Sequence, residues 1–345
     1  MDVVAPPSFG DATLLAVLAE HYGVVGQLHS LPGERHQIAR VDAESGERFI
    51  LKIANADEDP AATDLQIQAM MHLEHIGCPV PVPKVVKTVA GEPVAEMSVD
   101  SRRHVVQLLS HVDGVIMCDA MLSSDLLRHF GMRLAQLGDS FRDFEHPGDR
   151  PLSFWDMQRA LHLRSILQHI EDVDVLQAAS TALDDFEQRV LPRLPEIRQQ
   201  VIHNDANPNN VLVNADMSDV VGFFDFGDIL RAPLVVDVAV AASYLRSFGD
   251  DPLKFISPFV AGYHSVTEFH DTEFGLLFDL IRTRLTTTVA NLYWRMAARR
   301  GDESADQASA LGKESEAQLF LGRLDGIGRD SFTEQVLQAC SASKG

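Results

Sequence analysis

Two short apolar runs, each ending in a polar cluster, constrain the fold of this chain more than any other feature of its sequence. The runs Val211–Val213 and Val220–Phe224 flank the polar connection 214–219, and this pattern predicts a small β-hairpin. The polar residues at the ends of the runs are His203, Asp205, Asn210 and Asp225. Oxygen ligands in such an arrangement can hold a divalent metal and leave one carboxylate to orient a hydroxyl group.

The composition excludes several classes of function. A chain of 345 residues is long enough for about two lobes and a sizeable core. Its 29 Lys and Arg against 50 Asp and Glu give a net charge of −21, which would repel phosphate backbones and anionic lipids. We therefore expect no nucleic-acid partner and no membrane partner. The acidity fits a cationic small substrate, although acidity that serves only solubility is the commoner explanation.

The cysteines and the start of the chain indicate the compartment. Cys78, Cys118 and Cys340 are too scattered for a zinc motif and too few for a disulfide framework. The chain starts Met-Asp-Val-Val-Ala-Pro-Pro, without a basic start or a long apolar core, and no later run is long enough to span a bilayer. We expect a cytoplasmic protein.

Strand signals dominate the first 109 residues. We expect helices at 11–22 and 60–75 and strands at 27–31, 36–41, 48–54, 94–98 and 104–109. Lys52 lies inside the third of these strands. An inward Lys needs a charged partner or a ligand, because burying a bare ammonium group is costly. A Lys on an edge strand that faces water fits the pattern equally well.

Helical periodicity dominates after a connector at 110–114. We expect helices at 122–137, 154–170, 173–191, 233–248, 252–266, 274–300 and 314–322, and a loop at 299–309. These patterns predict an α+β architecture, with a β-rich N-terminal lobe over residues 1–109 and a mostly helical C-terminal lobe over residues 110–345. The hinge falls at about 109–113, and a cleft between two lobes is a favoured place for a small-molecule site.

The order of these features resembles that of a known family. A strand Lys, a helix, a Pro-Val-Pro-Lys segment and a hinge precede His-x-Asp-x-x-x-x-Asn and Asp-Phe-Gly-Asp. This order is similar to that of the aminoglycoside phosphotransferase and choline kinase branch of the protein-kinase-like fold. Within that branch, the chain looks most like hydroxylysine kinases and related amino-alcohol and amino-acid kinases. The segments that carry the closer match are 33–37, 202–207, 225–228 and 237–244.

The resemblance implies a role for each polar residue of the hairpin. Asp205 would accept or orient the proton of the attacking hydroxyl, and its position matters more than a raised pKa because the transition state of phosphoryl transfer is loose. Asn210 and Asp225 would hold Mg²⁺, which would bridge the terminal phosphates. Asp228 would meet either Mg²⁺ or a substrate ammonium group, and a surface carboxylate is an equally consistent interpretation.

The resemblance also implies a nucleotide site in the N-terminal lobe. Lys52 would pair with the inner phosphates of ATP or GTP. Backbone groups of the hinge 109–112, including those of Ser110 and Val112, would bind the purine. The candidate phosphate loop 31–36 has one Gly where the kinase pattern has Gly-x-Gly-x-x-Gly, so its side chains would have to help it hold phosphates. The side chains available for this are those of Arg35 and His36.

Two further departures from the family concern partners of these residues. The helix after Lys52 lacks a Glu at an unambiguous position, and Asp64 and Gln66 both compete to be the partner of the Lys. Asn204 stands where this branch commonly has Gly.

Other residues allow both a functional and a structural interpretation. Arg284 could clamp a substrate carboxylate, whereas an intramolecular ion pair is the commoner explanation for such an Arg. We expect His203 to hold the loop by packing and hydrogen bonding. Asp237 is either an N-cap or a residue that braces the catalytic loop. Tyr293 and Trp294 could wall a substrate pocket, although core packing is the default for aromatic residues at helical spacing.

We therefore predict a kinase that uses ATP or GTP and Mg²⁺ to phosphorylate a hydroxyl of a small, amine-bearing metabolite. A hydroxylated amino acid such as hydroxylysine is the leading acceptor. The alternative enzyme is an antibiotic phosphotransferase, with an aminoglycoside as a typical acceptor. A pseudokinase that binds nucleotide without catalysis would have lost its chemical residues, and here they are present.

Overall fold

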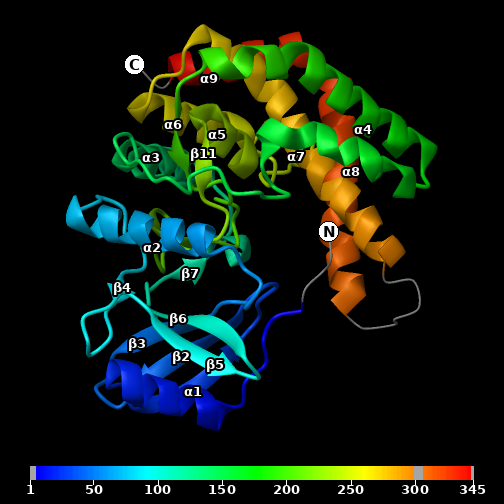
Figure 1. The fold of residues 1–345 in the computed structure, drawn as a ribbon. Helices are drawn as coiled ribbons and strands as arrows, with labels where there is room; N and C mark the ends of the chain where they lie inside the picture. Colours follow the sequence, from blue (N-terminus) through cyan, green and yellow to red (C-terminus); the bar gives the residue numbers. More distant parts are fainter. Residues whose placement is uncertain (1–4, 299–305, 343–345) are drawn as a thin grey trace. The chain divides into compact units, whose positions relative to one another are not determined.

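The computed structural model of the protein describes residues 5–298 and 306–342, with side chains described for 5–298 and 316–342. The chain divides into two compact units, the first rich in strands and the second in helices (Figure 1). Unit 1 comprises Met1–Asp113 and His146–Gly148, and unit 2 comprises Gly114–Glu145 and Asp149–Gly345.

Unit 1 is built on a six-stranded antiparallel sheet (Figure 1). Its strands are β1 (Gly26–Leu31), β2 (Gln37–Ala43), β3 (Arg48–Ile53), β4 (Val85–Val86), β5 (Ala95–Val99) and β6 (Arg102–Ser110). The order across the sheet is β1, β2, β3, β6, β4, and β5 also pairs with β6. The strands predicted in this region are confirmed. Because Lys52 pairs across β3 with Ile38 of β2 and Gln107 of β6, it lies on an interior strand, and the edge-strand interpretation is wrong.

Two helices accompany this sheet. α1 (Asp11–Val17) continues into a π-helical turn at Leu18–Tyr22, and the buried cluster of unit 1 joins its apolar side chains to those of the strands. α2 (Pro60–His75) starts where the sequence predicts, because the side chain of Asp59 accepts a hydrogen bond from the Ala61 amide and Pro60 stands at the first helical position.

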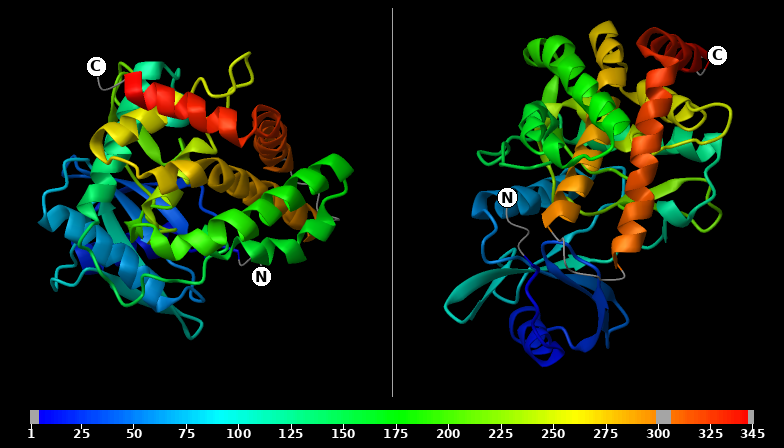
Figure 2. Two further views of the ribbon diagram at one scale, coloured as in Figure 1. Left: turned by 90° about the horizontal axis from the view of Figure 1, so that it is seen from above. Right: turned by 90° about the vertical axis from the view of Figure 1, so that its right-hand side faces the viewer.

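Unit 2 is mostly helical. α7 (Asp271–Ala298) has 28 residues and packs against four other α-helices. These are α4 (Val173–Asp185), α5 (Leu234–Ala242), α8 (Asp306–Ile327) and α9 (Arg329–Ala342). α7 is the long yellow-to-orange helix in Figure 2. Every residue of α7 from Leu276 to Leu292 is buried, so the polar residues of this stretch depend on partners inside the protein or on a ligand.

Two glycines let α3 (Ser124–Ser140) and α6 (Ile256–Val266) cross closely. A Cβ atom on Gly131 would lie 2.0 Å from the Phe259 carbonyl oxygen, and one on Gly262 would lie 2.0 Å from the Arg128 carbonyl oxygen. Both positions therefore require a residue without a side chain.

Short strands in unit 2 position the polar residues singled out above. The predicted hairpin is confirmed as the antiparallel pair β9 (Val211–Val213) and β10 (Val220–Phe223), and β7 (Val115–Ile116) pairs with β9. A second antiparallel pair, β8 (Gln199–Ile202) and β11 (Leu230–Pro233), brackets the hairpin in the sequence and was not predicted.

The helix expected at 154–170 is wrong. The chain instead forms 3₁₀ turns at Met157–Ser165 and Leu167–His169. The buried apolar residues recur every third position rather than at the 3.6-residue period of an α-helix, a spacing that suits a 3₁₀ helix. These residues are Met157, Ala160 and Leu163.

Other helix boundaries also differ from the prediction. α5 ends at Ala242, six residues before the expected end at Phe248, and α6 begins only at Ile256. The first part of the expected loop 299–309 lies outside the described residues, and its last part is already helical, since α8 begins at Asp306. α9 was not predicted.

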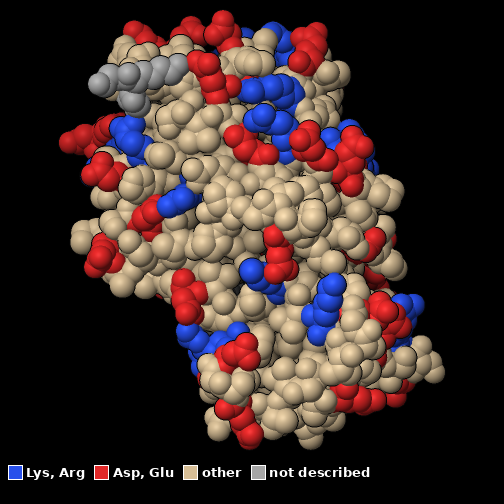
Figure 3. All heavy atoms as spheres, turned by 90° about the vertical axis from the view of Figure 1, so that its left-hand side faces the viewer, with Lys and Arg blue, Asp and Glu red and all other residues tan. Residues whose placement is uncertain are grey.

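The surface agrees with a chain that carries both signs of charge. Figure 3 shows one face, on which acidic and basic side chains are interspersed. Within the described ranges, no helix combines the length and the apolar character that crossing a bilayer requires.

Candidate active site

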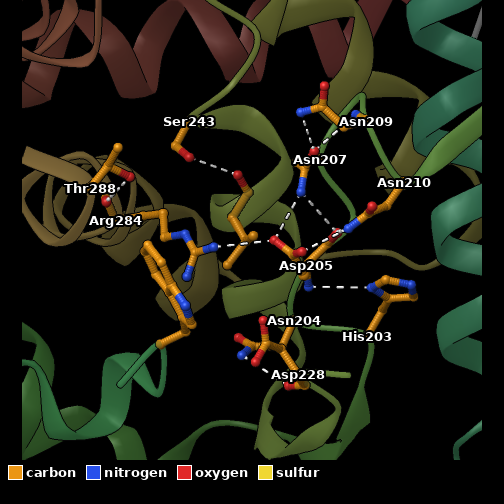
Figure 4. Close-up of polar contacts among 12 residues, drawn as sticks. His203, Asn204, Asp205, Asn207, Asn209, Asn210, Asp228, Ser243, Arg284 and Thr288 are labelled. Atoms are coloured by element: carbon orange, nitrogen blue, oxygen red, sulfur yellow. Dashed lines mark hydrogen bonds and ion pairs between the residues drawn. The ribbon is translucent and has the colours of Figure 1, made fainter. Parts of the chain in front are cut away.

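The loop between β8 and β9 is held together around the carboxylate of Asp205. Its Oδ1 atom accepts a hydrogen bond of 2.9 Å from the side-chain amide of Asn207. Its Oδ2 atom accepts one of 2.7 Å from the side-chain amide of Asn210. Figure 4 shows both amides directed at this carboxylate. The loop therefore presents one carboxylate in a fixed orientation.

Asp237 of α5 holds the start of this loop through hydrogen bonds to its backbone. Its two carboxylate oxygens accept hydrogen bonds from the backbone amides of His203, at 3.3 Å, and Asn204, at 2.7 Å. Asn204 has a φ of +61°, a left-handed conformation that Asn tolerates better than most residues. The N-cap of α5 is Pro233, so the N-cap interpretation of Asp237 is wrong and the bracing interpretation fits.

His203 also has a structural role. It is fully buried, its Nδ1 accepts a hydrogen bond from the Asp205 amide at 3.3 Å, and its Nε2 donates to the Phe224 carbonyl at 3.1 Å. Burial lowers its pKa, which keeps the ring neutral and the tautomer consistent with these two bonds. His203 thus links the loop to the end of β10.

The electrostatic surroundings of Asp205 are mixed. Burial raises the pKa of Asp205 to about 7, and the negative charge of Asp228 acts in the same direction. The positive charge of Arg284 and the hydrogen bond from Asn207 oppose this shift. A carboxyl group between opposing influences is typical of catalytic sites.

Asn210 and Asp225 offer the oxygen ligands that a hard divalent cation prefers. The amide nitrogen of Asn210 donates both to the Asp205 carbonyl, at 3.0 Å, and to its carboxylate. These bonds fix the orientation of the amide and leave its oxygen as a possible ligand. The Phe224 amide donates to the Asn210 carbonyl at 3.0 Å, which ties the residue before Asp225 to Asn210. The donor set therefore fits Mg²⁺.

Arg284 of α7 reaches the same carboxylate from another direction. Its side chain is 1% exposed, and its Nη2 atom lies 3.3 Å from Oδ1 of Asp205. The guanidinium carbon lies over the ring of Trp155, 4.3 Å from the ring centroid, which is a cation–π contact. Trp155 was not singled out in the sequence, where its only signal is that the chain has two Trp residues.

Asp228 interacts with this cluster in two ways. Its negative charge raises the pKa of Asp205, and its backbone contacts Asn204. Its carbonyl oxygen accepts a hydrogen bond of 3.1 Å from the side chain of Asn204. The two aromatic residues considered for a pocket wall have protein partners instead. The Tyr293 hydroxyl donates to Gln318 at 3.2 Å, and Trp294 stacks on Phe154.

In unit 1, Lys52 is buried with a neutral partner. Its side chain is 8% exposed, and its Nζ atom lies 3.3 Å from the side-chain oxygen of Gln66. Asp64, the other candidate partner, lies 3.1 Å from His146 instead. The ammonium group of Lys52 therefore has a hydrogen-bond acceptor but no anionic group in that contact.

The loop before β2 holds the two candidate phosphate-loop side chains in different environments. Arg35 is exposed, whereas His36 is buried with its Nε2 atom 2.5 Å from Glu58. Burial lowers the pKa of His36, and the hydrogen bond to Glu58 opposes this. Gly33 is required here, because a Cβ atom would lie 2.2 Å from the His36 carbonyl oxygen.

The two hinge residues lie at and beyond the end of β6. The Ser110 amide donates to the Lys84 carbonyl and its hydroxyl accepts from the Lys84 amide, both at 2.9 Å. Val112 lies two residues beyond the end of β6. It belongs to the short segment that precedes Gly114, the first residue of unit 2.

Replacing Asp237 by Ala is expected to lower the free energy of unfolding by about 2–4 kcal/mol, because two buried amides lose their acceptor. Chemical denaturation measures the effect. The matched control is Asp216→Ala in the exposed turn of the hairpin, which we expect to change stability by less than about 0.5 kcal/mol. Equal stabilities of the two variants would contradict the bracing role.

Comparisons with known proteins agree with this geometry. The model of the phosphotransferase enzyme family, APH, matches residues 30–274. A hydroxylysine kinase from Danio rerio is 26% identical over 293 residues, which span 81% of this chain and 82% of that protein. A solved microcompartment-associated aminopropanol kinase aligns with a TM-score of 0.73 at 20% identity, covering 92% of this chain and 99% of that one. An amicoumacin kinase in complex with AMP-PNP, Ca²⁺ and Ami aligns with a TM-score of 0.69 at 17% identity, covering 90% and 93%.

These matches confirm the resemblance seen in the sequence. The solved structures share the protein-kinase-like fold, with its β-rich N-terminal lobe and mostly helical C-terminal lobe. The family match spans more than half of the chain. The chain therefore belongs to the phosphotransferase enzyme family and is a phosphotransferase that acts on hydroxyl groups.

Proposed function

We propose that the protein transfers the terminal phosphoryl group of ATP or GTP to a hydroxyl group of a small, amine-bearing metabolite. A hydroxylated amino acid such as hydroxylysine is the leading acceptor. The observation that carries this proposal is the carboxylate of Asp205, oriented by Asn207 and Asn210 within one loop. Phosphoryl transfer asks for positioned groups of this kind more than for covalent chemistry by the protein.

In the proposed reaction, Asp205 orients the acceptor hydroxyl and takes its proton. A bond forms between the acceptor oxygen and the terminal phosphorus, while the bond from that phosphorus to the bridging oxygen of the nucleotide breaks. The products are a phosphate monoester and a nucleoside diphosphate. Asn207 and Asn210 keep the carboxylate aligned throughout, because each donates to a different oxygen of Asp205.

Asn210 and Asp225 are the residues proposed to hold Mg²⁺. A bound Mg²⁺ would neutralise charge on the phosphate oxygens and orient them. The amicoumacin kinase that shares the fold was solved with AMP-PNP and Ca²⁺, a nucleotide analogue and a divalent cation. This supports the same kind of co-substrate and ion here.

Lys52 is proposed to pair with inner phosphates of the nucleotide, since its contact in unit 1 is the neutral Gln66. Replacing Lys52 by Met is expected to raise the KM for nucleotide by about ten-fold or more, because a charge-assisted contact is lost. Steady-state kinetics with varied nucleotide measure this. The control is Lys87→Met, which removes an exposed Lys of the same unit. An unchanged KM in the Lys52 variant would remove this residue from the nucleotide site.

Two kinds of acceptor compete within this proposal. Relatives named hydroxylysine kinase support an amino-acid acceptor, and the amicoumacin kinase supports an acceptor of the kind that its name gives. A site for an aminoglycoside needs a broad acidic rim for several ammonium groups, whereas a site for an amino acid needs a cation for one carboxylate. Arg284 beside Asp205 favours the amino acid.

The test is a nucleotide-consumption screen of purified protein over hydroxylated amino acids, amino alcohols and aminoglycosides. We expect consumption of ATP or GTP that depends on the acceptor and is strongest with a hydroxylated amino acid. Nucleotide binding without consumption for the whole panel would instead indicate a binding protein without catalytic activity.

A further inference from the structure

Two buried arginines on α7 differ in how completely they are paired. Arg282 is 4% exposed and donates to Asp325 at 2.7 Å and to Asp185 at 2.6 Å. Arg284, two residues later, has one long contact of 3.3 Å, to Asp205. Within the described side chains, its Nε and Nη1 atoms have no hydrogen-bond partner although both are buried. Arg282 is thus a structural residue, whereas Arg284 has N–H groups that can still bind an acceptor.

The aromatic partner of Arg284 does not satisfy these donors. The guanidinium carbon of Arg284 lies over the ring of Trp155, 4.3 Å from the ring centroid, and this cation–π contact supplies no oxygen or nitrogen acceptor. The N–H groups of a guanidinium point outward in its own plane, where they form a fork that matches a carboxylate. A buried donor without an acceptor is unfavourable, so a ligand that supplies the acceptor would gain binding free energy.

Different residues contact the two carboxylate oxygens of Asp205, so the site has two distinct sides. Asn210, a proposed metal ligand, bonds Oδ2 of Asp205, whereas Arg284 contacts Oδ1. In Figure 4, Asn210 and Arg284 lie on opposite sides of this carboxylate. A Mg²⁺ held by Asn210 and Asp225 would place the terminal phosphates on the Asn210 side, which would leave the Arg284 side for the acceptor.

We propose that Arg284, in cation–π contact with Trp155, binds the carboxylate of the acceptor while Asp205 binds its hydroxyl group. This inference rests on the proposed kinase activity and narrows the acceptor to hydroxylated amino acids with a free carboxylate. Asp228 lies on a further side of Asp205 in Figure 4 and supplies negative charge near it, which suits the ammonium group of the same acceptor.

The experiment compares acceptors that differ only in the carboxylate. Hydroxylysine is paired with the diamino alcohol that it leaves on decarboxylation, and threonine is paired with aminopropanol. The values of kcat/KM are measured for each pair with wild-type protein and with Arg284→Met and Arg284→Lys. Any damage to Asp205 lowers both members of a pair alike, so the ratio within a pair isolates recognition of the carboxylate.

We expect wild-type protein to prefer the amino acid, and Arg284→Met to lower this preference by about ten-fold or more, mainly through KM. Arg284→Lys keeps the charge but loses the fork, and an intermediate ratio is expected. The matched control Arg282→Met should lower thermal stability and leave the ratio unchanged. An increase in the KM for nucleotide alone would mean that Arg284 binds a phosphate, and it would overturn the proposal.

A binding measurement covers variants with little turnover. In a Trp294→Phe background, Trp155 is the remaining Trp of the chain, and its fluorescence is titrated with each acceptor. We expect the amino acid to change the signal at lower concentration than its decarboxylated partner, and Arg284→Met to remove that difference. Equal kcat/KM values and equal fluorescence titrations for the amino acid and its decarboxylated partner would overturn the inference about Arg284. Transfer to amino alcohols in that case would still support the proposed kinase activity. Absence of transfer to every acceptor would instead overturn the proposed function.

Discussion

Replacing Asp205 by Asn is expected to lower kcat by about 10²–10⁴-fold, the usual contribution of a positioned acid or base. The amide cannot take the proton of the acceptor hydroxyl, although it has nearly the size of the carboxylate. Nucleotide affinity should change by less than about three-fold, because Asp205 is not proposed to hold the nucleotide or its Mg²⁺, and the Asn210 amide keeps its bond to the Asp205 backbone carbonyl. Single-turnover kinetics and a nucleotide binding isotherm measure the two quantities separately.

The control for this variant is Asp216→Asn, the same chemical change in the exposed turn of the hairpin. Its kcat should equal that of the wild type. Arg284 loses its charged partner in the Asp205 variant, so a thermal melt must establish that the variant is folded. A folded Asp205→Asn protein with wild-type turnover would show that this carboxylate is not the one that acts on the hydroxyl.

Replacing Asp225 by Asn is expected to weaken Mg²⁺–nucleotide binding by at least about ten- to hundred-fold, a loss that even outer partners of metal ligands can cause. The variant should need more Mg²⁺ for half-maximal activity, and high Mg²⁺ should restore part of kcat. This dependence distinguishes Asp225 from Asp205, whose loss no Mg²⁺ concentration should repair. Titration of activity and of nucleotide affinity with Mg²⁺ provides the measurement.

A Mg²⁺ dependence equal to that of the wild type would exclude Asp225 as a metal ligand. Asp225 has a φ of +59°, a left-handed conformation that Asn adopts at least as readily as Asp. The Asn variant therefore tests the charge of the ligand with little change in backbone strain.

The sequence predicted best what depends on local pattern. The hairpin of β9 and β10 and the strands of unit 1 follow from short apolar runs and turn residues. The pair β8 and β11 was missed because each strand has four residues and β11 ends in Pro, a residue that weakens a strand pattern. The turns at Met157–Ser165 resemble an α-helix in sequence because a three-residue spacing is close to the helical period.

The candidate site shows the limit of sequence more clearly. Asp205 and Asn210 are neighbours within one motif, so their contact could be expected. Arg284 is 79 residues from Asp205, and only the packing of α7 brings the two together. From the sequence we consider Arg284 alone for a substrate carboxylate, but Arg282 lies in the same apolar helix and the pattern does not show which of the two has protein partners. Their different partners are a property of the tertiary structure.

The partner of Lys52 is likewise decided by tertiary packing. Asp64 and Gln66 both lie on α2, and only the structure gives the contact to Gln66. The structure also shows that the charge of Lys52 acts on Glu58, whose carboxylate pairs with His36, an interaction that the sequence alone did not indicate.

Phosphorus NMR of a reaction with ATP, Mg²⁺ and hydroxylysine is the sharpest test of phosphoryl transfer to a small hydroxylated amine. We expect a new phosphate-monoester resonance that grows in step with ADP and is absent with Asp205→Asn. Bound but intact nucleotide with every tested acceptor, including the amino alcohols and aminoglycosides, would show that the protein does not transfer the phosphoryl group. ADP with inorganic phosphate and no monoester would show the same.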